Sequence, residues 1–181
     1  MADDLERQIV RIIAANTKME NGRTVKQNLE AAVDYLYDCV DMHIREYYLS
    51  YEPRVYNRTY DFMDSLYAEN FINARVKDNR IELSVSFRDS MAYHTNIFGD
   101  HESYVPALIN FGWKAPKLES MIGSRYRFTY YEGYHFIEKA IRMFNRRNPY
   151  GVYIDPSDVV AEYNGQDISY REFDWGALSD L

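Results

Sequence analysis

The longest regular pattern of apolar positions in the chain begins after residue 24 and predicts a long α-helix. Apolar residues recur there mostly in steps of four and three, which is the spacing of one helix face: Val25, Leu29, Val33, Leu36, Val40, Ile44 and Tyr47. Thr24 and Gln27 have the spacing of a capping box, which starts a helix. Pro53 prevents the helix from continuing. We therefore expect a helix of about 26 residues, roughly 39 Å long at a rise of about 1.5 Å per residue.

A second pattern, over residues 72–87, alternates between apolar and polar positions and predicts a β-hairpin. Its apolar members are Ile72, Ala74, Val76, Ile81, Leu83, Val85 and Phe87. Asp78 and Asn79 lie between the two arms, and both residue types tolerate the positive φ angles of a tight turn. The two strands would share one apolar face, and the long helix is the obvious element to cover it.

Three further segments have helical patterns. Residues 3–15 have acids in the first turn and apolar positions at Leu5, Ile9, Ile12 and Ile13. Residues 103–113 predict a short helix, with Pro106 in its first turn and Gly112 as its C-terminal cap. Residues 133–149 predict a third long helix, which ends with arginines in its last turn. Its apolar face consists of Phe136, Ile137, Ala140, Ile141 and Phe144.

We interpret residues 89–103 as a loop, and residues 114–133 as an irregular, aromatic segment. Asn164-Gly165 between apolar-containing arms predicts a late two-residue hairpin. The order of elements is helix, helix, hairpin, short helix, helix, hairpin. This order indicates an α+β fold, with long helices packed on a small antiparallel β-sheet.

The charge of the chain is divided unevenly, which suggests a boundary near residue 150. Residues 151–181 hold seven acids and one base, whereas the preceding 150 residues hold the other 21 acids and 20 bases. We expect a single body over residues 1–150, made of the helix at 3–15 and a core at 24–147. The acidic C-terminal tail at 151–181 would contain the late hairpin. Such a tail suits solvent or a basic partner surface and disfavours nucleic acid.

The high tyrosine content suggests that part of the protein surface makes contacts with other proteins. The chain has 18 tyrosines in 181 residues, and few of them could be buried with their hydroxyl groups satisfied. Tyrosine is enriched at protein–protein interfaces, so the excess suggests a contact surface. The alternative is that these residues occupy half-buried positions of the sheet.

Other features of composition narrow the class of protein. Cys39 is the only cysteine, which excludes an internal disulfide and a cysteine-based zinc site and fits a reducing compartment. No run of about 18 apolar residues occurs, so we expect no membrane span. The acidic start, "MADDLERQIV", does not resemble a secretory signal.

Candidate catalytic chemistry is confined to one polar segment. P-loop, GxGxxG, GxSxG and HExxH patterns are absent from the sequence. The segment "YHTNIFGDHES" places His94, Asp100, His101 and Glu102 within nine residues, and such side chains can bind a metal. Their spacing matches no metal signature, so we interpret the segment as an ordinary polar loop. A small metal-dependent hydrolase or nuclease that uses this loop is the alternative.

A group of arginines, Arg142, Arg146 and Arg147, lies near the end of the third long helix. They could contact phosphate, or they could complement the negative end of the helix dipole while remaining solvated. The second interpretation, helix-dipole complementation, agrees with the acidic sequence pI of about 5.1. They could also meet the acidic tail of a neighbouring subunit, which charge complementarity would favour.

The connector at residues 50–66 completes a recognisable order of features. The long helix is followed, in order, by Pro53, Arg58, Thr59, Ser65 and Leu66. Then come the strand pattern "IELSVSF" and Ala92-Tyr93, and the late helix contributes an aromatic residue, an acid and an alanine: Phe136, Glu138 and Ala140. Over about residues 24–147 this order resembles the tail-completion (head–tail joining, minor tail or neck) proteins of tailed bacteriophages. That family often has glycine after the threonine, where this chain has Tyr60.

The resemblance implies a structural virion protein, assembled in the host cytoplasm, and not an enzyme. It implies a homo-oligomeric ring, commonly hexameric, with a portal or head-completion protein on one side and the tail tube protein on the other. DNA would pass through without specific binding, and no cofactor, metal or membrane is expected. The resemblance does not distinguish a tail-completion subunit from a head-completion subunit. A regulatory adaptor that binds through the acidic tail is a further alternative.

The predicted interface consists of the connector at 50–66, the loop at 88–104 and the arginines of the last long helix. The candidate residues are Pro53, Arg54, Tyr56, Arg58, Thr59, Tyr93, Tyr104, Arg146 and Arg147.

Overall fold

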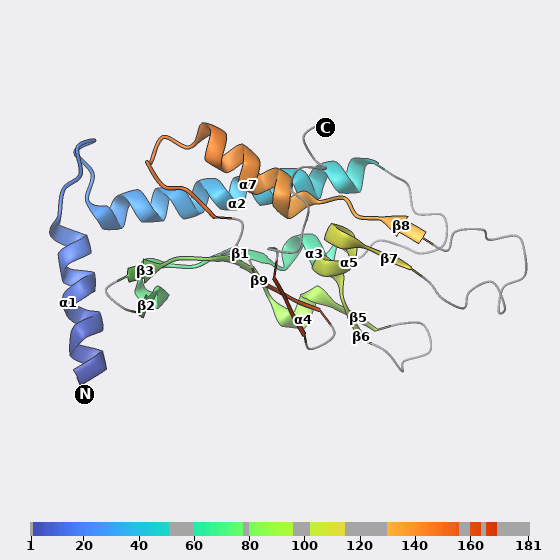
Figure 1. The fold of residues 1–181 in the computed structure, drawn as a ribbon, viewed down its shortest axis with the longest axis horizontal. Coiled ribbons are helices and arrows are strands. Elements are labelled where there is room, and N and C mark those ends of the chain that lie inside the picture. The colour runs from blue at the N-terminus through green and yellow to red at the C-terminus, as the bar shows by residue number, and fades with distance from the viewer. Residues whose placement is uncertain are drawn as a thin grey trace, which may run out of the picture.

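The protein has the α+β fold that the sequence predicts (Figure 1). The computed structural model describes residues 2–50, 60–77, 80–95, 102–114, 130–155, 160–163 and 166–169. Long helices lie on antiparallel sheets, each of which has two strands in the described residues. The helix α2 (Val25–Ser50) is the axis of the molecule, and the other elements are arranged along it (Figure 1).

The predicted long helix is confirmed at both its start and its apolar face. α2 has 26 residues. The Gln27 amide donates a 3.2 Å hydrogen bond to Thr24 Oγ1, and the Thr24 amide donates a 3.0 Å bond to Gln27 Oε1. This reciprocal pair is a capping box, which satisfies two amides that the first helical turn leaves without partners. The face that α2 buries includes Val33, Val40 and Ile44.

The second predicted long helix, α7 (Phe136–Arg147), packs along α2 and forms the centre of the core (Figure 1). Phe136, Ala140 and Phe144 of α7 are almost completely buried and belong to the same apolar cluster as Ile44. Complete burial of one such large side chain stabilises the fold by about 1.5–3 kcal/mol. The α2–α7 contact is therefore the main stabilising interface between helices.

The predicted hairpin over residues 72–87 is present only in part. β2 (Arg75–Lys77) pairs with β3 (Arg80–Glu82), and Lys77 opposes Arg80. The predicted turn residues, Asp78 and Asn79, lie outside the described residues. However, β4 (Val85–Phe87) pairs with an earlier strand, β1 (Leu66–Ala68), and not with the segment at Ile72. The prediction of one uninterrupted strand from Ile72 is wrong.

The interruption is a short 3-10 helix, η1 (Phe71–Asn73), inserted between β1 and β2. The Glu69 amide donates a 2.9 Å bond to the Ser84 carbonyl, which continues the β1–β4 ladder, and the next paired residue on this arm is Arg75. Residues 70–74 therefore oppose a single residue of the other arm, in the manner of an enlarged β-bulge. Phe71 is buried, and the Lys26 ammonium lies 5.4 Å from its ring centroid. Burial of Phe71 against α2 thus outweighs regular strand pairing.

The segments predicted as loops contain regular structure. α3 (Asp61–Asp64) precedes β1, and α4 (Asp89–Ala92) leads into β5 (Tyr93–Thr95), which pairs with β6 (Glu102–Tyr104). The prediction of a loop over 89–103 is therefore wrong at both ends of that segment. A three-residue strand gives little periodic signal, which explains the error.

The predicted short helix is present as α5 (Val105–Phe111), which follows β6 directly. Pro106 lies in its first turn, and Gly112 follows the helix with a positive φ of 78°. Beyond it, β7 (Gly112–Lys114) pairs with β8 (Tyr130–Glu132), so strands occupy the two ends of the segment that was predicted to be irregular.

The chain after α7 continues to pack on the body. Asn145 fixes this segment, because its Nδ2 donates a 2.9 Å bond to the Ile154 carbonyl and its Oδ1 accepts a 3.0 Å bond from the Ile154 amide. Val152 and Ile154 contact the core cluster. β9 (Val160–Tyr163) and β10 (Gln166–Ser169) then pair across residues 164–165, as the Asn-Gly signal predicts.

Candidate functional site

The N-terminal helix α1 (Ala2–Asn16) stands across one end of the molecule, beside the start of α2 and the β2–β3 pair (Figure 1). Four of its large apolar residues face away from the body. They are exposed to 61% for Leu5, 46% for Ile9, 62% for Ile12 and 57% for Ile13. We call these four residues the α1 stripe.

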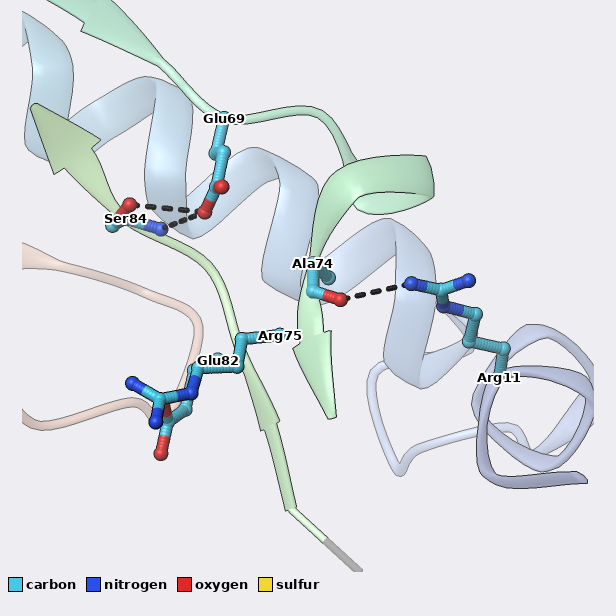
Figure 2. A network of polar contacts seen from close by, with 6 residues as sticks. All are labelled: Arg11, Glu69, Ala74, Arg75, Glu82 and Ser84. Atoms are coloured by element: carbon cyan, nitrogen blue, oxygen red, sulfur yellow. Dashed lines mark hydrogen bonds and ion pairs between the residues drawn. The ribbon is translucent and has the colours of Figure 1, made fainter. Parts of the chain in front are cut away.

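The opposite face of α1 makes the contact with the body. Ala14 is buried, and at about 100° per residue it lies roughly half a turn around the helix from Leu5. Arg11 Nη2 donates a 2.9 Å hydrogen bond to the backbone carbonyl of Ala74, at the start of β2 (Figure 2). The helix is therefore anchored through an alanine and an arginine, and its aliphatic face stays uncovered.

This orientation leaves apolar surface in water that a partner could remove. Complete burial of a leucine or isoleucine is worth about 1.5–3 kcal/mol. Because the four side chains of the α1 stripe are roughly half exposed, covering them would contribute on the order of 4 kcal/mol. Single exposed apolar residues are ordinary, but a contiguous set marks an interaction surface. We therefore regard the α1 stripe as the candidate functional site.

The surface next to α1 is formed by the bulged hairpin, and polar contacts fix its shape (Figure 2). Glu69 Oε2 accepts a 2.9 Å bond from Ser84 Oγ and a 3.3 Å bond from the Ser84 amide, which holds the two arms together where η1 begins. Arg75 Nε lies 3.9 Å from Glu82 Oε2 across the β2–β3 pair. The Arg11 anchor attaches α1 to this same hairpin.

Five of the predicted interface residues lie outside the described residues: Pro53, Arg54, Tyr56, Arg58 and Thr59. The predicted interface at the connector therefore stays a prediction.

Two predicted interface residues, Tyr93 and Tyr104, are brought together. They face each other across the β5–β6 pair, and their ring centroids are 5.2 Å apart at an interplanar angle of 47°. Tyr93 is 44% exposed. The β5–β6 strands that carry this pair lie away from α1, toward the other end of α2 (Figure 1).

Arg146 and Arg147 lie in the last turn of α7, and both are exposed. Their positive charges lie near the negative end of the helix dipole, as expected of a cation in this position. The charge of Arg147 also reaches the buried Cys39, but burial is the larger effect and raises the pKa of that thiol. A buried thiol with a raised pKa is a poor nucleophile.

The polar segment considered for metal binding is only partly described. The β5–β6 register sets Glu102 opposite Thr95 and sets His94 opposite Ser103. Asp100 and His101 lie outside the described residues. Within the described parts of the chain, no three histidine, cysteine or carboxylate side chains lie close enough to hold one metal ion.

A buried polar contact that the sequence analysis did not predict positions α5 against α7. Asn110 Oδ1 accepts a 2.9 Å bond from the Ile137 amide, and Asn110 Nδ2 donates a 2.9 Å bond to Glu138 Oε1. Asn110 and Glu138 are both fully buried. Gly133 lies directly against this contact, since a Cβ there would be 2.3 Å from the Asn110 carbonyl oxygen. We assign this contact a structural role, because it caps α7 and joins two helices.

A second unpredicted group lies where α7 begins, beside the last third of α2. The Lys139 ammonium lies 3.6 Å from the Tyr134 ring centroid, and desolvation lowers the pKa of Lys139. Desolvation also raises the pKa of Tyr134, to which the nearby negative charge of Glu46 adds. Glu46 Oε2 lies 2.7 Å from His43 Nδ1. Ring, cation and carboxylate are neighbours only in the folded chain, so no sequence motif indicates them.

No helix in the part of the chain that the structure describes combines the length and apolar composition that crossing a membrane requires. Comparisons with protein-family models, with curated proteins and with solved structures find no match to this chain.

Proposed function

We propose that this chain is a structural subunit of a tailed-bacteriophage virion, and that it forms a homo-oligomeric ring at the head–tail junction. It would act as a tail-completion or connector subunit, with a head-side and a tail-tube-side neighbour and without catalysis. The resemblance over residues 24–147 supplies the type of assembly. The uncovered α1 stripe is the observation that carries the proposal.

The distribution of exposed apolar side chains supports head-to-tail association. A ring subunit contacts its two neighbours through two different surfaces. The α1 stripe lies at one end of α2, and the pair Tyr93–Tyr104 lies toward the other end (Figure 1). Leu49, in the last turn of α2, adds a side chain that is 87% exposed. Two separate apolar surfaces on one rigid helix–sheet body fit this kind of assembly.

The charge of the chain supports a passive role toward DNA. The formal net charge is −7, and phosphate binding depends on clustered lysine and arginine. A lumen lined by such a chain would let the duplex pass without specific contact.

Negative-stain electron microscopy of the purified full chain, together with mass photometry, tests this proposal. We expect rings for the wild type. We expect mainly monomers for the Ile9→Asp/Ile12→Asp variant, because two carboxylates on the α1 stripe would have to be desolvated in the contact. Tyr153→Asp is the matched control, since Tyr153 is 71% exposed and lies outside α1. A wild-type chain that stays monomeric at every concentration would refute the proposed function.

A further inference from the structure

The turn between α1 and α2 contains an asparagine followed directly by a glycine, Asn21 and Gly22. Such a pair can react with itself, because the backbone nitrogen of the glycine can attack the side-chain carbonyl carbon of the asparagine. Glycine permits this close approach, since it has no Cβ and adopts backbone conformations that other residues avoid. The sequence holds a second pair of this kind, Asn164-Gly165, which lies outside the described residues.

The reaction, a deamidation, converts the side-chain amide into an acid and consumes one water molecule. A bond forms between the Gly22 nitrogen and Asn21 Cγ, the bond between Cγ and Nδ2 breaks, and ammonia leaves with the proton of the Gly22 amide. Water then opens the five-membered imide at either of its two carbonyls. The products are an aspartate in the normal backbone and an isoaspartate, in which the backbone runs through the side chain.

Three hydrogen bonds restrain the groups that would react. Asn21 Nδ2 donates a 3.0 Å bond to Asn28 Oδ1, and Asn21 Oδ1 accepts a 3.1 Å bond from the Arg23 amide. The Gly22 amide donates a 2.9 Å bond to the Met19 carbonyl. The side chain of Asn21 is therefore held at both of its polar atoms, and the proton of the attacking nitrogen is engaged.

The contact with Asn28 ties this turn to the segment that follows α7. Asn28 is 1% exposed, and its Nδ2 donates a 2.6 Å bond to the Tyr150 carbonyl. Its amide donor and its carbonyl acceptor thus have one partner each. Asn21 and Gly22 are exposed, and no atom lies within 4 Å of the Cβ position of Gly22. Water therefore has access to the turn.

From this arrangement we infer that Asn21 is a deamidation site, which the contact with Asn28 protects and which opens to reaction when that contact is lost. The site is a property of the single chain and does not depend on the proposed ring. Its reaction partner is water, and its products are aspartate and isoaspartate at position 21.

Deamidation would also weaken the junction in which Asn28 lies. A carboxylate at position 21 has no hydrogen to donate, so Asn28 Oδ1 would lose its partner. Rotation of the Asn28 amide would give the carboxylate a donor but would turn Oδ1 toward the Tyr150 carbonyl. One hydrogen bond of a buried side chain is lost in either orientation, and such a loss is costly.

Peptide mapping by mass spectrometry follows the reaction in the unmodified chain. Trypsin cuts after Lys18 and Arg23, so the site lies in a peptide of its own, residues 19–23. The full chain is incubated in mildly alkaline buffer with and without guanidinium chloride. We expect deamidation of Asn21 to be slower by about tenfold or more without denaturant, because the folded chain reacts only while the turn is open. Equal rates would overturn the protection, and no reaction in denaturant would overturn the site.

The variant Asn28→Ala tests which contact protects the site. We expect the rate at Asn21 to rise by about tenfold in the folded variant, because the turn opens more often. Asn145→Ala is the matched control, since it also removes two hydrogen bonds to the segment after α7 but leaves the partner of Asn21 in place. The same rise in both variants, or in neither, would overturn the role of Asn28.

The variant Asn21→Asp reproduces the aspartate product directly, and it gives an answer even if Asn28→Ala does not fold. We expect its Tm to lie about 4 °C or more below that of the wild type. Asn73→Asp introduces the same charge at another exposed position and should shift the Tm less. Equal shifts in the two variants would overturn the coupling between the Asn21 side chain and the buried Asn28.

Discussion

Arg11 donates a 2.9 Å hydrogen bond to the backbone carbonyl of Ala74, 63 positions further along the chain. This hydrogen bond joins the N-terminal helix to the bulged hairpin. The orientation of α1, and with it the candidate site, depends on this contact and on the burial of Ala14.

Replacement of Arg11 should therefore loosen α1 without unfolding the body. We expect Arg11→Ala to lower the free energy of unfolding by about 1.5–3 kcal/mol, the range for a hydrogen bond to a charged group. Hydrogen exchange should be faster in α1 than in the wild type and unchanged in α2. Arg7→Ala is the control, because Arg7 is exposed on the same helix. Equal exchange in α1 of the two variants would contradict the anchoring role.

The buried contact between Asn110 and Glu138 predicts unequal effects of two substitutions. Asn110→Ala removes the partner of the Ile137 amide and leaves the buried carboxylate without its 2.9 Å donor. We expect the free energy of unfolding, measured in urea, to fall by about 3 kcal/mol, because two buried polar groups lose their hydrogen-bond partner. Glu138→Gln keeps an acceptor for Asn110 and should remain within about 1 kcal/mol of the wild type. The reverse order would show that the carboxylate itself stabilises the contact.

Two glycines should respond differently to the same substitution. Gly133→Ala would place a Cβ 2.3 Å from the Asn110 carbonyl oxygen and 2.6 Å from the Phe111 carbonyl carbon. We expect it to destabilise the fold by about 2–3 kcal/mol through overpacking. Gly22 has a φ of +79° and no atom within 4 Å of its Cβ position. Gly22→Ala should cost only the strain of the left-handed conformation, about 1–2 kcal/mol. Thermal unfolding of both variants tests this difference.

The buried thiol predicts a pH dependence of stability on the alkaline side. Burial raises the pKa of Cys39 above its ordinary value of 9.0, and the negative charge of Asp38 adds to this, while a hydrogen bond with Tyr35 and the charge of Arg147 oppose it. The unfolded chain therefore releases the thiol proton at a lower pH than the folded chain. The contribution of Cys39 is fully present below pH 9.0 and is lost as the pH rises through the folded pKa. Urea unfolding between pH 8 and pH 10 should show a smaller loss of stability for Cys39→Ala than for the wild type. Identical pH slopes would contradict the effect of burial.

Sequence patterns correctly predicted the elements whose structure depends on residues that are neighbours in the chain. Thr24 and Gln27 form both hydrogen bonds of the predicted capping box. The face of α2 that is buried includes Val33, Val40 and Ile44, which belong to the predicted apolar pattern. Pro106 and Gly112 bound α5 as their backbone preferences require. Each of these features depends on residues within a few positions of one another.

The parts that were predicted incorrectly depend on distant residues. The alternation over 72–87 suggested one continuous hairpin, but Phe71 buries its side chain against α2 and forces η1 into one arm. Ile72, counted as a core position of that strand, is 77% exposed. A side chain that packs on another element can override a local pattern, because burial of a phenylalanine outweighs the pairing of a few strand residues.

The helix that carries the candidate site was predicted, but the exposure of its apolar face was not. The helix pattern at Leu5, Ile9, Ile12 and Ile13 indicated an apolar face, and such a pattern is normally turned toward the core of the same chain. Which face of α1 packs on the body depends on Arg11 and Ala74, and no pattern within the helix reveals that pairing. Tyr93 and Tyr104 were predicted as interface residues from their chain position, and their ring contact follows from the β5–β6 register.

The most direct test of the central claim is electron microscopy of the wild-type chain beside the Ile12→Asp variant at the same concentration. The account predicts closed rings for the wild type and single folded molecules for the variant, whose circular dichroism should be unchanged because Ile12 is 62% exposed. Rings of equal abundance in both samples, or single molecules in both, would contradict it.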